Sequence, residues 1–285
     1  MRDYSAAVAK EKQTLVDYIQ QGMNKVSQQE KLAIKSKWLI VENVENVITF
    51  SYSNNQMPFS GNSSAGVAQG FFIELWQMWA KSSGLEIKFV MGDLAEFNQT
   101  NINMADVHIT SMTNEQANNS SALGPVIYRV NYGLFVSNDT KEVLHTTEIK
   151  GKNVGVVRIP SFEKDIQNKI TSSTVIYFDD YTTMFAAAER GELDVIAGQV
   201  DIIESYLIEY KLQSVYTKLN SYSFKQDVHA MLNKVNPKLS KLIVKGFESL
   251  PLEDLVSLEN KWHLDGSSGF FNNRLTALAL TDKEN

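Results

Sequence analysis

The stretch from Thr174 to Leu207 constrains the fold of this chain more than any other part of it. A short apolar run is followed by an acidic turn, a helical segment, a Gly-x-Leu-Asp turn at Gly191 to Asp194, a second apolar run and a second helical segment. Strands that alternate with helices are typical of the α/β class, in which helices cover a sheet. We therefore expect an α/β fold.

The stretch from Ala105 to Tyr128 supplies the first candidate for a binding site. Val107 and Ile109 alternate with polar residues and lead into a cluster of hydroxyl groups that includes Ser111 and Thr113. Small polar side chains at the carboxyl end of a strand are how open α/β sheets offer hydrogen bonds to a ligand. This pattern predicts a strand that ends at a ligand site.

Composition and charge exclude several function classes. The net charge of -6 and the pI near 5.4 argue against nucleic-acid binding, which requires a basic excess or a basic stripe. The absence of cysteine excludes disulfide scaffolds, cysteine-based zinc sites and thiol nucleophiles. No apolar run reaches the roughly 18 residues of a membrane span, and the first residues lack the apolar core of a signal peptide. The chain is therefore either cytoplasmic or a mature or excised extracytoplasmic piece.

Catalytic and metal-binding patterns are weak. There is no phosphate-cradling glycine motif, no Gly-x-Ser-x-Gly and no His-Glu-x-x-His. The four histidines have no metal-ligand spacing and are interpreted as surface or strand residues; they are His108, His145, His229 and His263. We expect no catalytic residue, no metal site and no cofactor.

An internal repeat relates the two ends of the chain. Residues 5 to 38 have helical periodicity, and several of them recur 224 positions later. The identical pairs are Leu15 and Leu239, Ile19 and Ile243, Gly22 and Gly246, Lys37 and Lys261, and Trp38 and Trp262. Either two amphipathic helix pairs share a pattern, or residues 1–38 are the closing helices of a preceding copy of the same domain.

Three segments carry a resemblance to a known family: Gly70 to Trp79, Ala105 to Tyr128, and Gly191 to Ile203. Together they resemble the bacterial periplasmic solute-binding proteins of family 3, the amino-acid-binding type with a type II periplasmic-binding fold. Such domains also occur in tandem as extracytoplasmic sensors of membrane signalling proteins. The resemblance implies a two-lobed Venus flytrap with two hinge crossings, here with an added N-terminal helical segment.

The resemblance also implies domain boundaries. We expect an N-terminal helical segment over residues 1–44, which is the end of a preceding repeat under the second interpretation above. Lobe 1 then comprises 45–136 and 222–265, lobe 2 comprises 137–221, and 266–285 form a C-terminal tail or linker.

The resemblance implies six ligand-binding positions. In the family an aromatic residue beside a proline stacks on the ligand, and Phe59 stands there, although a loop aromatic that caps the core fits equally well. The family's Ser/Thr-x-Thr-x-x-Arg motif falls on Ser111 and Thr113, with Gln116 in place of the arginine. A helix start that grips anions falls on Ser161, and the acid that pairs with an α-amine is replaced by Gln199.

Two neutral glutamines change the expected ligand. An amino acid needs a cation for its carboxylate and a carboxylate for its ammonium group, and burying either charge without a partner costs several kcal/mol. We therefore expect that ordinary α-amino acids do not bind in the family's usual pose. A neutral or hydroxyl-rich solute, or an empty cleft, suits Gln116 and Gln199 better, and Asp201 is a weaker alternative source of the missing acid.

The leading hypothesis is a non-enzymatic extracytoplasmic sensor domain of a membrane-bound signalling protein, located in the periplasm as part of an inner-membrane protein. A transport-associated binding protein is the alternative, and an enzyme of the same fold, such as a periplasmic dehydratase, is a second alternative. The expected partners are a small polar molecule in the inter-lobe cleft, a neighbouring repeat domain and a membrane-anchored output domain. The resemblance also allows a homodimer formed through the parent receptor, and no nucleic acid is expected.

Overall fold

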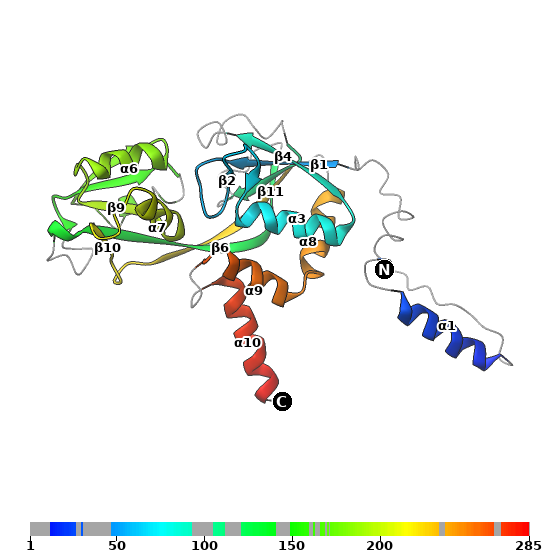
Figure 1. The fold of residues 1–285 in the computed structure, drawn as a ribbon. Coiled ribbons are helices and arrows are strands. Elements are labelled where there is room, and N and C mark those ends of the chain that lie inside the picture. The colour runs from blue at the N-terminus through cyan, green and yellow to red at the C-terminus, as the bar shows by residue number, and fades with distance from the viewer. Residues whose placement is uncertain are drawn as a thin grey trace.

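The computed structural model describes residues 12–26, 30, 47–92, 105–111, 121–140, 149–159, 162, 166–168, 170, 172–233, 237–264 and 269–284. A nine-stranded mixed sheet runs through most of them, in the order β4-β1-β5-β11-β6-β9-β7-β8, with β10 paired to β6 (Figure 1). Its strands are β1 (Val47–Ser53), β4 (Glu86–Gly92), β5 (Val107–Ser111), β6 (Ser121–Ser137), β7 (Asn153–Val157), β8 (Thr174–Phe178), β9 (Val195–Gln199), β10 (Tyr216–Lys218) and β11 (Phe224–Asn233). Two short strands, β2 (Gly61–Asn62) and β3 (Ala68–Gln69), form a separate ribbon, and a 3₁₀ turn covers Asn138–Thr140.

The strand β6 joins two lobes. Its first part pairs antiparallel with β11 as far as Tyr132, and its second part pairs antiparallel with β9 from Tyr132 onward. The chain returns to the first lobe between β10 and β11. The sheet therefore passes from one lobe to the other through two crossing segments, and the predicted two-lobed α/β fold with two hinge crossings is confirmed.

Lobe 1 has an aromatic core. The parallel strands β4, β1 and β5 are covered by α3 (Phe71–Ser83), whose Trp76 and Trp79 pack on Phe50 of β1 with ring centroids 4.5 and 6.0 Å apart. Both tryptophans are fully buried and form part of the core of this lobe. The helices α8 (Pro237–Glu248) and α9 (Leu252–Lys261) pack on α3 and complete this lobe.

Lobe 2 contains the parallel strands β8, β7 and β9, with the helices α6 (Tyr181–Glu189) and α7 (Val200–Glu209). The helix α6 begins at Asp180, whose side chain accepts a hydrogen bond of 2.7 Å from the backbone N–H of Thr183. The succession of strand, helix, strand and helix predicted from Thr174 onward is confirmed.

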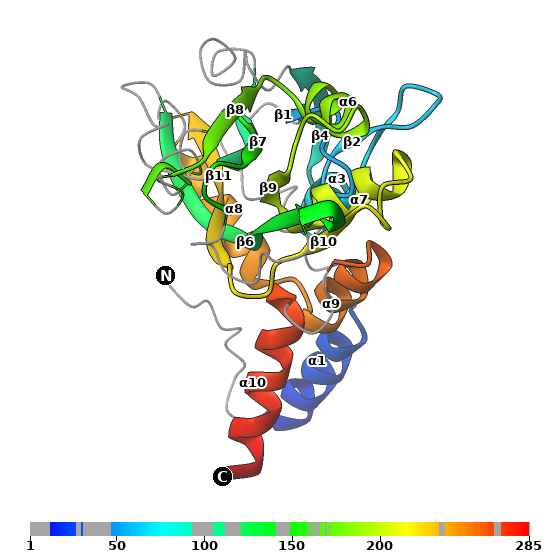
Figure 2. The same cartoon turned by 90° about the vertical axis from the view of Figure 1, so that its left-hand side faces the viewer.

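Two helices project from the lobes, α1 (Gln13–Lys25) and α10 (Phe270–Glu284), as Figure 1 and Figure 2 show. The helix α1 lies within the predicted N-terminal helical segment. The helix α10 occupies most of the segment predicted as a tail or linker. None of the described helices is both long and apolar enough to cross a bilayer.

The helices α1 and α8 correspond in the repeat, yet their surroundings differ. In α8, Leu239 and Ile243 are 1% and 0% exposed, whereas their counterparts Leu15 and Ile19 in α1 are 43% and 38% exposed. A Cβ added to Gly246 would lie 2.2 Å from Nε1 of Trp79, whereas nothing lies within 4 Å of a Cβ added to Gly22. The residues that pack α8 into lobe 1 recur in α1, but among the described residues nothing packs against them there.

Replacing Gly246 with alanine should destabilise lobe 1. Although alanine favours a helix over glycine by about 1 kcal/mol, the added methyl would displace the buried ring of Trp79, and overpacking costs about 1–3 kcal/mol. We expect the free energy of unfolding, measured in urea by tryptophan fluorescence, to fall. Gly22→Ala is the matched control, and a loss of equal size in both variants would contradict the packing described here.

Candidate ligand site between the lobes

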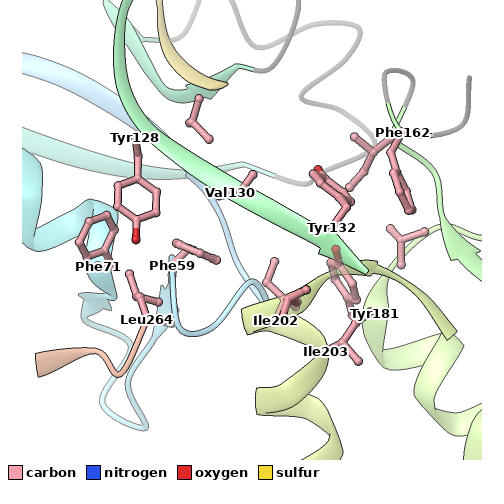
Figure 3. Close-up of a cluster of buried hydrophobic side chains, with 14 of the residues drawn as sticks. Phe59, Phe71, Tyr128, Val130, Tyr132, Phe162, Tyr181, Ile202, Ile203 and Leu264 are labelled. Atoms are coloured by element: carbon pink, nitrogen blue, oxygen red, sulfur yellow. The ribbon is translucent and has the colours of Figure 1, made fainter. Parts of the chain in front are cut away.

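The candidate site is the region where β6 passes between the lobes. Tyr132 is fully buried and pairs with Phe224 of β11 on one side and with Gln199 of β9 on the other. Its ring packs against Phe162 in a tilted arrangement, with the ring centroids 4.3 Å apart. Burial raises the pKa of its hydroxyl well above the usual value, so it stays protonated. Figure 3 shows that the buried cluster around β6 includes side chains from both lobes.

Gln199 lies at this hinge. It is the last residue of β9 and directly precedes α7, and its side chain is 4% exposed. A position between the end of a strand and the start of a helix is where α/β folds hold ligands. The group that this chain offers there is a neutral amide.

Asp201, the weaker candidate for an acid, lies in the first turn of α7. Burial raises the pKa of the Tyr128 hydroxyl, and the Glu259 and Asp201 carboxylates add to the rise. Because Tyr128 belongs to lobe 1 and Asp201 to lobe 2, the Asp201 charge is felt across the boundary between the lobes. A carboxylate therefore lies near this boundary, two residues after Gln199.

Phe59 is a core residue in this structure. Its ring is 1% exposed, stacks on Phe72 at 5.2 Å and lies 6.2 Å from both Phe71 and Tyr128. Ile202 of α7 belongs to the same buried cluster (Figure 3). These contacts agree with the interpretation of Phe59 as an aromatic that caps the core, and its role in stacking on a solute stays a prediction.

A hydrogen bond connects the lobes directly. The hydroxyl of Tyr206 in α7 donates to the backbone carbonyl of Asn55, in the loop after β1, at 2.8 Å. Burial raises the pKa of Tyr206 to about 12, which keeps its hydroxyl protonated at neutral pH. The lobes are thus held together by contacts of the protein itself.

Buried hydroxyls at the end of β1 form a second polar group that sequence reasoning missed. Ser51, Ser53 and Ser60 are at most 5% exposed, and Ser60 donates to the carbonyl of Ser53 at 2.7 Å. The Nδ1 atom of His108 shares a hydrogen bond with Oγ of Ser51, and burial lowers the pKa of His108 to about 4. His108 is therefore a neutral, buried strand residue at physiological pH. The alternation of serine with aromatic residues at 50–53 was the available signal for an inward-facing polar row.

The remaining predicted site residues are only partly accounted for. Ser111 is the last residue of β5, which pairs parallel with β1, so it lies at the carboxyl end of adjacent parallel strands as expected. Thr113, Gln116 and Ser161 lie outside the described residues. Within the described ranges no group of three or more histidine, aspartate or glutamate side chains could hold a metal ion. The ligand-binding roles of all six positions stay predictions.

Residues 48–265 match the model of bacterial extracellular solute-binding proteins, family 3. No curated protein matches the chain by sequence.

Solved structures match the fold at low sequence identity. An ancestral arginine-binding protein bound to arginine has a TM-score of 0.67 at 18% identity, over 78% of this chain and 100% of that one. The periplasmic VFT2 domain of BvgS from Bordetella pertussis has a TM-score of 0.67 at 15% identity, over 81% of this chain and 98% of that one. The whole periplasmic domain of BvgS has the same TM-score at 14% identity, over 89% of this chain and 48% of that one. At these identities the likeness establishes the fold.

Replacing Tyr206 with phenylalanine should loosen the contact between the lobes. The change removes the hydroxyl that donates to Asn55 and leaves that carbonyl to water, at a cost of about 0.5–1.5 kcal/mol. We expect the radius of gyration, measured by small-angle X-ray scattering, to increase. Tyr210→Phe is the control, because the Tyr210 hydroxyl makes no hydrogen bond among the described residues; an unchanged radius in Tyr206→Phe would show that this bond does not hold the lobes.

Proposed function

The chain belongs to the bacterial extracellular solute-binding proteins of family 3, and from this we propose that it is a ligand-sensing domain of a membrane-bound signalling protein. Its two lobes close on a small polar solute, and the change in lobe position is the signal. The observation that carries the proposal is the hinge itself: one continuous strand serves both lobes, and the lobes already touch through Tyr206 and Asn55. The likeness to a periplasmic domain of BvgS supports the sensor assignment.

The solute we propose is neutral or rich in hydroxyl groups. Gln199, at the hinge end of β9, presents an amide that donates and accepts hydrogen bonds but carries no charge. An ammonium group buried beside Gln199 would lack a counter-charge at that position, and that loss is enough to remove useful affinity unless Asp201 supplies the charge. The arginine-binding protein that shares the fold therefore does not set the specificity of this chain.

Isothermal titration calorimetry tests this proposal. Titration with the common α-amino acids, arginine and glutamine included, should give no heat that corresponds to micromolar binding, because the two predicted charge partners are Gln116 and Gln199. Neutral polyols, sugars and carboxamides form the second set of ligands, screened first by thermal shift. Gln199→Ala should abolish the shift from any hit, whereas Gln213→Ala, on the exposed surface, should not. Micromolar binding of an α-amino acid that depends on Gln199 would refute the proposal.

We also propose that residues 1–44 end a preceding copy of the same domain. The described helix α1 begins at Gln13, and α8 begins at Pro237, 224 positions later, which is the spacing of the repeat. The apolar residues of α1 that correspond to the buried ones of α8 are exposed. The whole periplasmic domain of BvgS covers 89% of this chain, compared with 81% for its VFT2 domain alone, which agrees with an extra segment that belongs to a neighbouring unit.

A helix that closes a preceding domain favours a receptor with domains in series over a free transport protein. The remaining elements of the proposal are the lobe boundaries 45–136 with 222–265 and 137–221, attachment to the inner membrane, and a membrane-anchored output domain. Two further predictions are that the chain has no enzymatic activity and that a homodimer forms through the parent receptor.

A protein extended upstream by one repeat tests the tandem arrangement. In that protein Gly22 should pack against the counterpart of Trp79, as Gly246 does here, so Gly22→Ala should lower the stability of the preceding unit by about 1–3 kcal/mol. In the present chain the same substitution has room for its methyl group. If upstream codons encode no repeat, or if Gly22→Ala is harmless in the longer protein, the tandem arrangement is wrong.

A further inference from the structure

The start of α10 is fixed to lobe 1 by a buried carboxylate. Glu259 of α9 is fully buried and accepts hydrogen bonds from the Tyr128 hydroxyl at 2.7 Å, from the backbone and side-chain nitrogens of Asn272 at 2.9 Å, and from the backbone of Phe271 at 3.3 Å. A Cβ on Gly269 would lie 2.6 Å from this carboxylate, so the approach requires glycine. The first turn of α10 is therefore held in a defined position beside β6.

A cavity of about 210 Å³ lies between this turn and the crossing strands β6 and β11. Because it is smaller than the 300–1,000 Å³ typical of drug-sized sites, its occupant is small. Neither Gln199 nor Tyr132 lines this cavity. Its polar and aromatic lining comprises Arg129, Asn131, Lys225, Phe270, Asn273 and Arg274.

The lining is cationic although the chain as a whole has a net charge of -6. Arg129, Lys225 and Arg274 all line the cavity, and no carboxylate does. Arg129 is paired with Asp227 at 2.6 Å, whereas Lys225 and Arg274 have no carboxylate partner among the described residues. Two solvent-exposed positive charges therefore line the cavity together with the amides of Asn131 and Asn273.

The three cationic side chains that line the cavity come from β6, β11 and α10. The guanidinium groups of Arg129 and Arg274 lie 5.8 and 5.7 Å from the centroid of the same ring, Phe270. Lys225 pairs with Asn131 and Asp227 with Arg129 in the register of β6 and β11, so the four side chains share one face of this two-stranded ribbon. Arginine and lysine positioned in this way suit an oxyanion, which arginine binds in a bidentate manner and lysine as a point charge.

We propose that this cavity binds a small oxyanion with two or more negative charges, such as a phosphate group. Lys225 and Arg274 neutralise its charge, and the amides of Asn131 and Asn273 donate hydrogen bonds to its remaining oxygens. One wall belongs to the strands that cross between the lobes and the other to α10, so the bound anion fastens the C-terminal helix to the hinge. The site does not depend on the identity or presence of a solute between the lobes.

Titration of inorganic phosphate at low ionic strength tests the proposal, with calorimetry and thermal shift as readouts. Wild type should bind and gain thermal stability, and Lys225→Gln with Arg274→Gln should weaken binding at least tenfold. The control is Lys241→Gln with Arg190→Gln, which removes equal charge from exposed positions elsewhere and should leave binding unchanged. Because both altered side chains lie at the surface of the cavity, the variant should fold, which circular dichroism verifies.

Vesicles distinguish the source of the phosphate. If the protein binds vesicles that contain phosphatidic acid but not vesicles of pure phosphatidylcholine, and free phosphate competes with this binding, the site is assigned to a lipid headgroup. If the protein binds free phosphate but neither kind of vesicle, the site is assigned to a soluble anion. The proposal is overturned if wild type does not bind phosphate at about 10 mM. It is also overturned if the double variant and its control bind phosphate equally. Neither result would bear on the solute site, which is tested at Gln199.

Discussion

The architecture depends on the hydrogen-bonded ladder of β6. One strand cannot serve two lobes unless its backbone groups find partners on both sides of the crossing, and Tyr132 meets this requirement by pairing with β11 and β9. Both of its neighbours in the ladder come from later parts of the chain, so the hinge forms only when lobe 2 is complete and the chain has returned. The burial of Tyr132 and its contact with Phe162 then fix where the bend between the lobes can occur.

Several polar side chains around this crossing carry no charge. Gln199 is uncharged, Tyr132 and Tyr206 keep their protons, and His108 is neutral because burial lowers its pKa to about 4. Charged groups lie nearby as well: Asp201 in the first turn of α7, the buried Glu259 carboxylate bonded to Tyr128, and the cationic lining of the cavity beside α10. A neutral amide at Gln199 favours hydrogen-bonding solutes over zwitterions at that position.

Much of the fold could be predicted from the sequence because its signals are local. Alternating apolar residues predicted the strand β5, and the Gly-x-Leu-Asp turn predicted the boundary between α6 and β9. The acidic turn before α6 contains its N-cap residue, Asp180. The surroundings of individual side chains could not be predicted in the same way. Whether Phe59 faces a ligand or Phe72 depends on the packing of distant elements, and neither the buried Glu259 network nor the cavity at Lys225 has a sequence signature, because each is assembled from elements more than a hundred residues apart.

The attachment of α10 has a mechanical consequence. This helix is bonded to lobe 1 through Glu259, and its fifteen residues extend it by about 22 Å away from the lobes. A stiff arm clamped at one end magnifies any rotation of its base, so a tilt of a few degrees at the crossing strands becomes a displacement of one or two ångströms at its tip. The helix α10 therefore follows the orientation of lobe 1 rather than that of lobe 2.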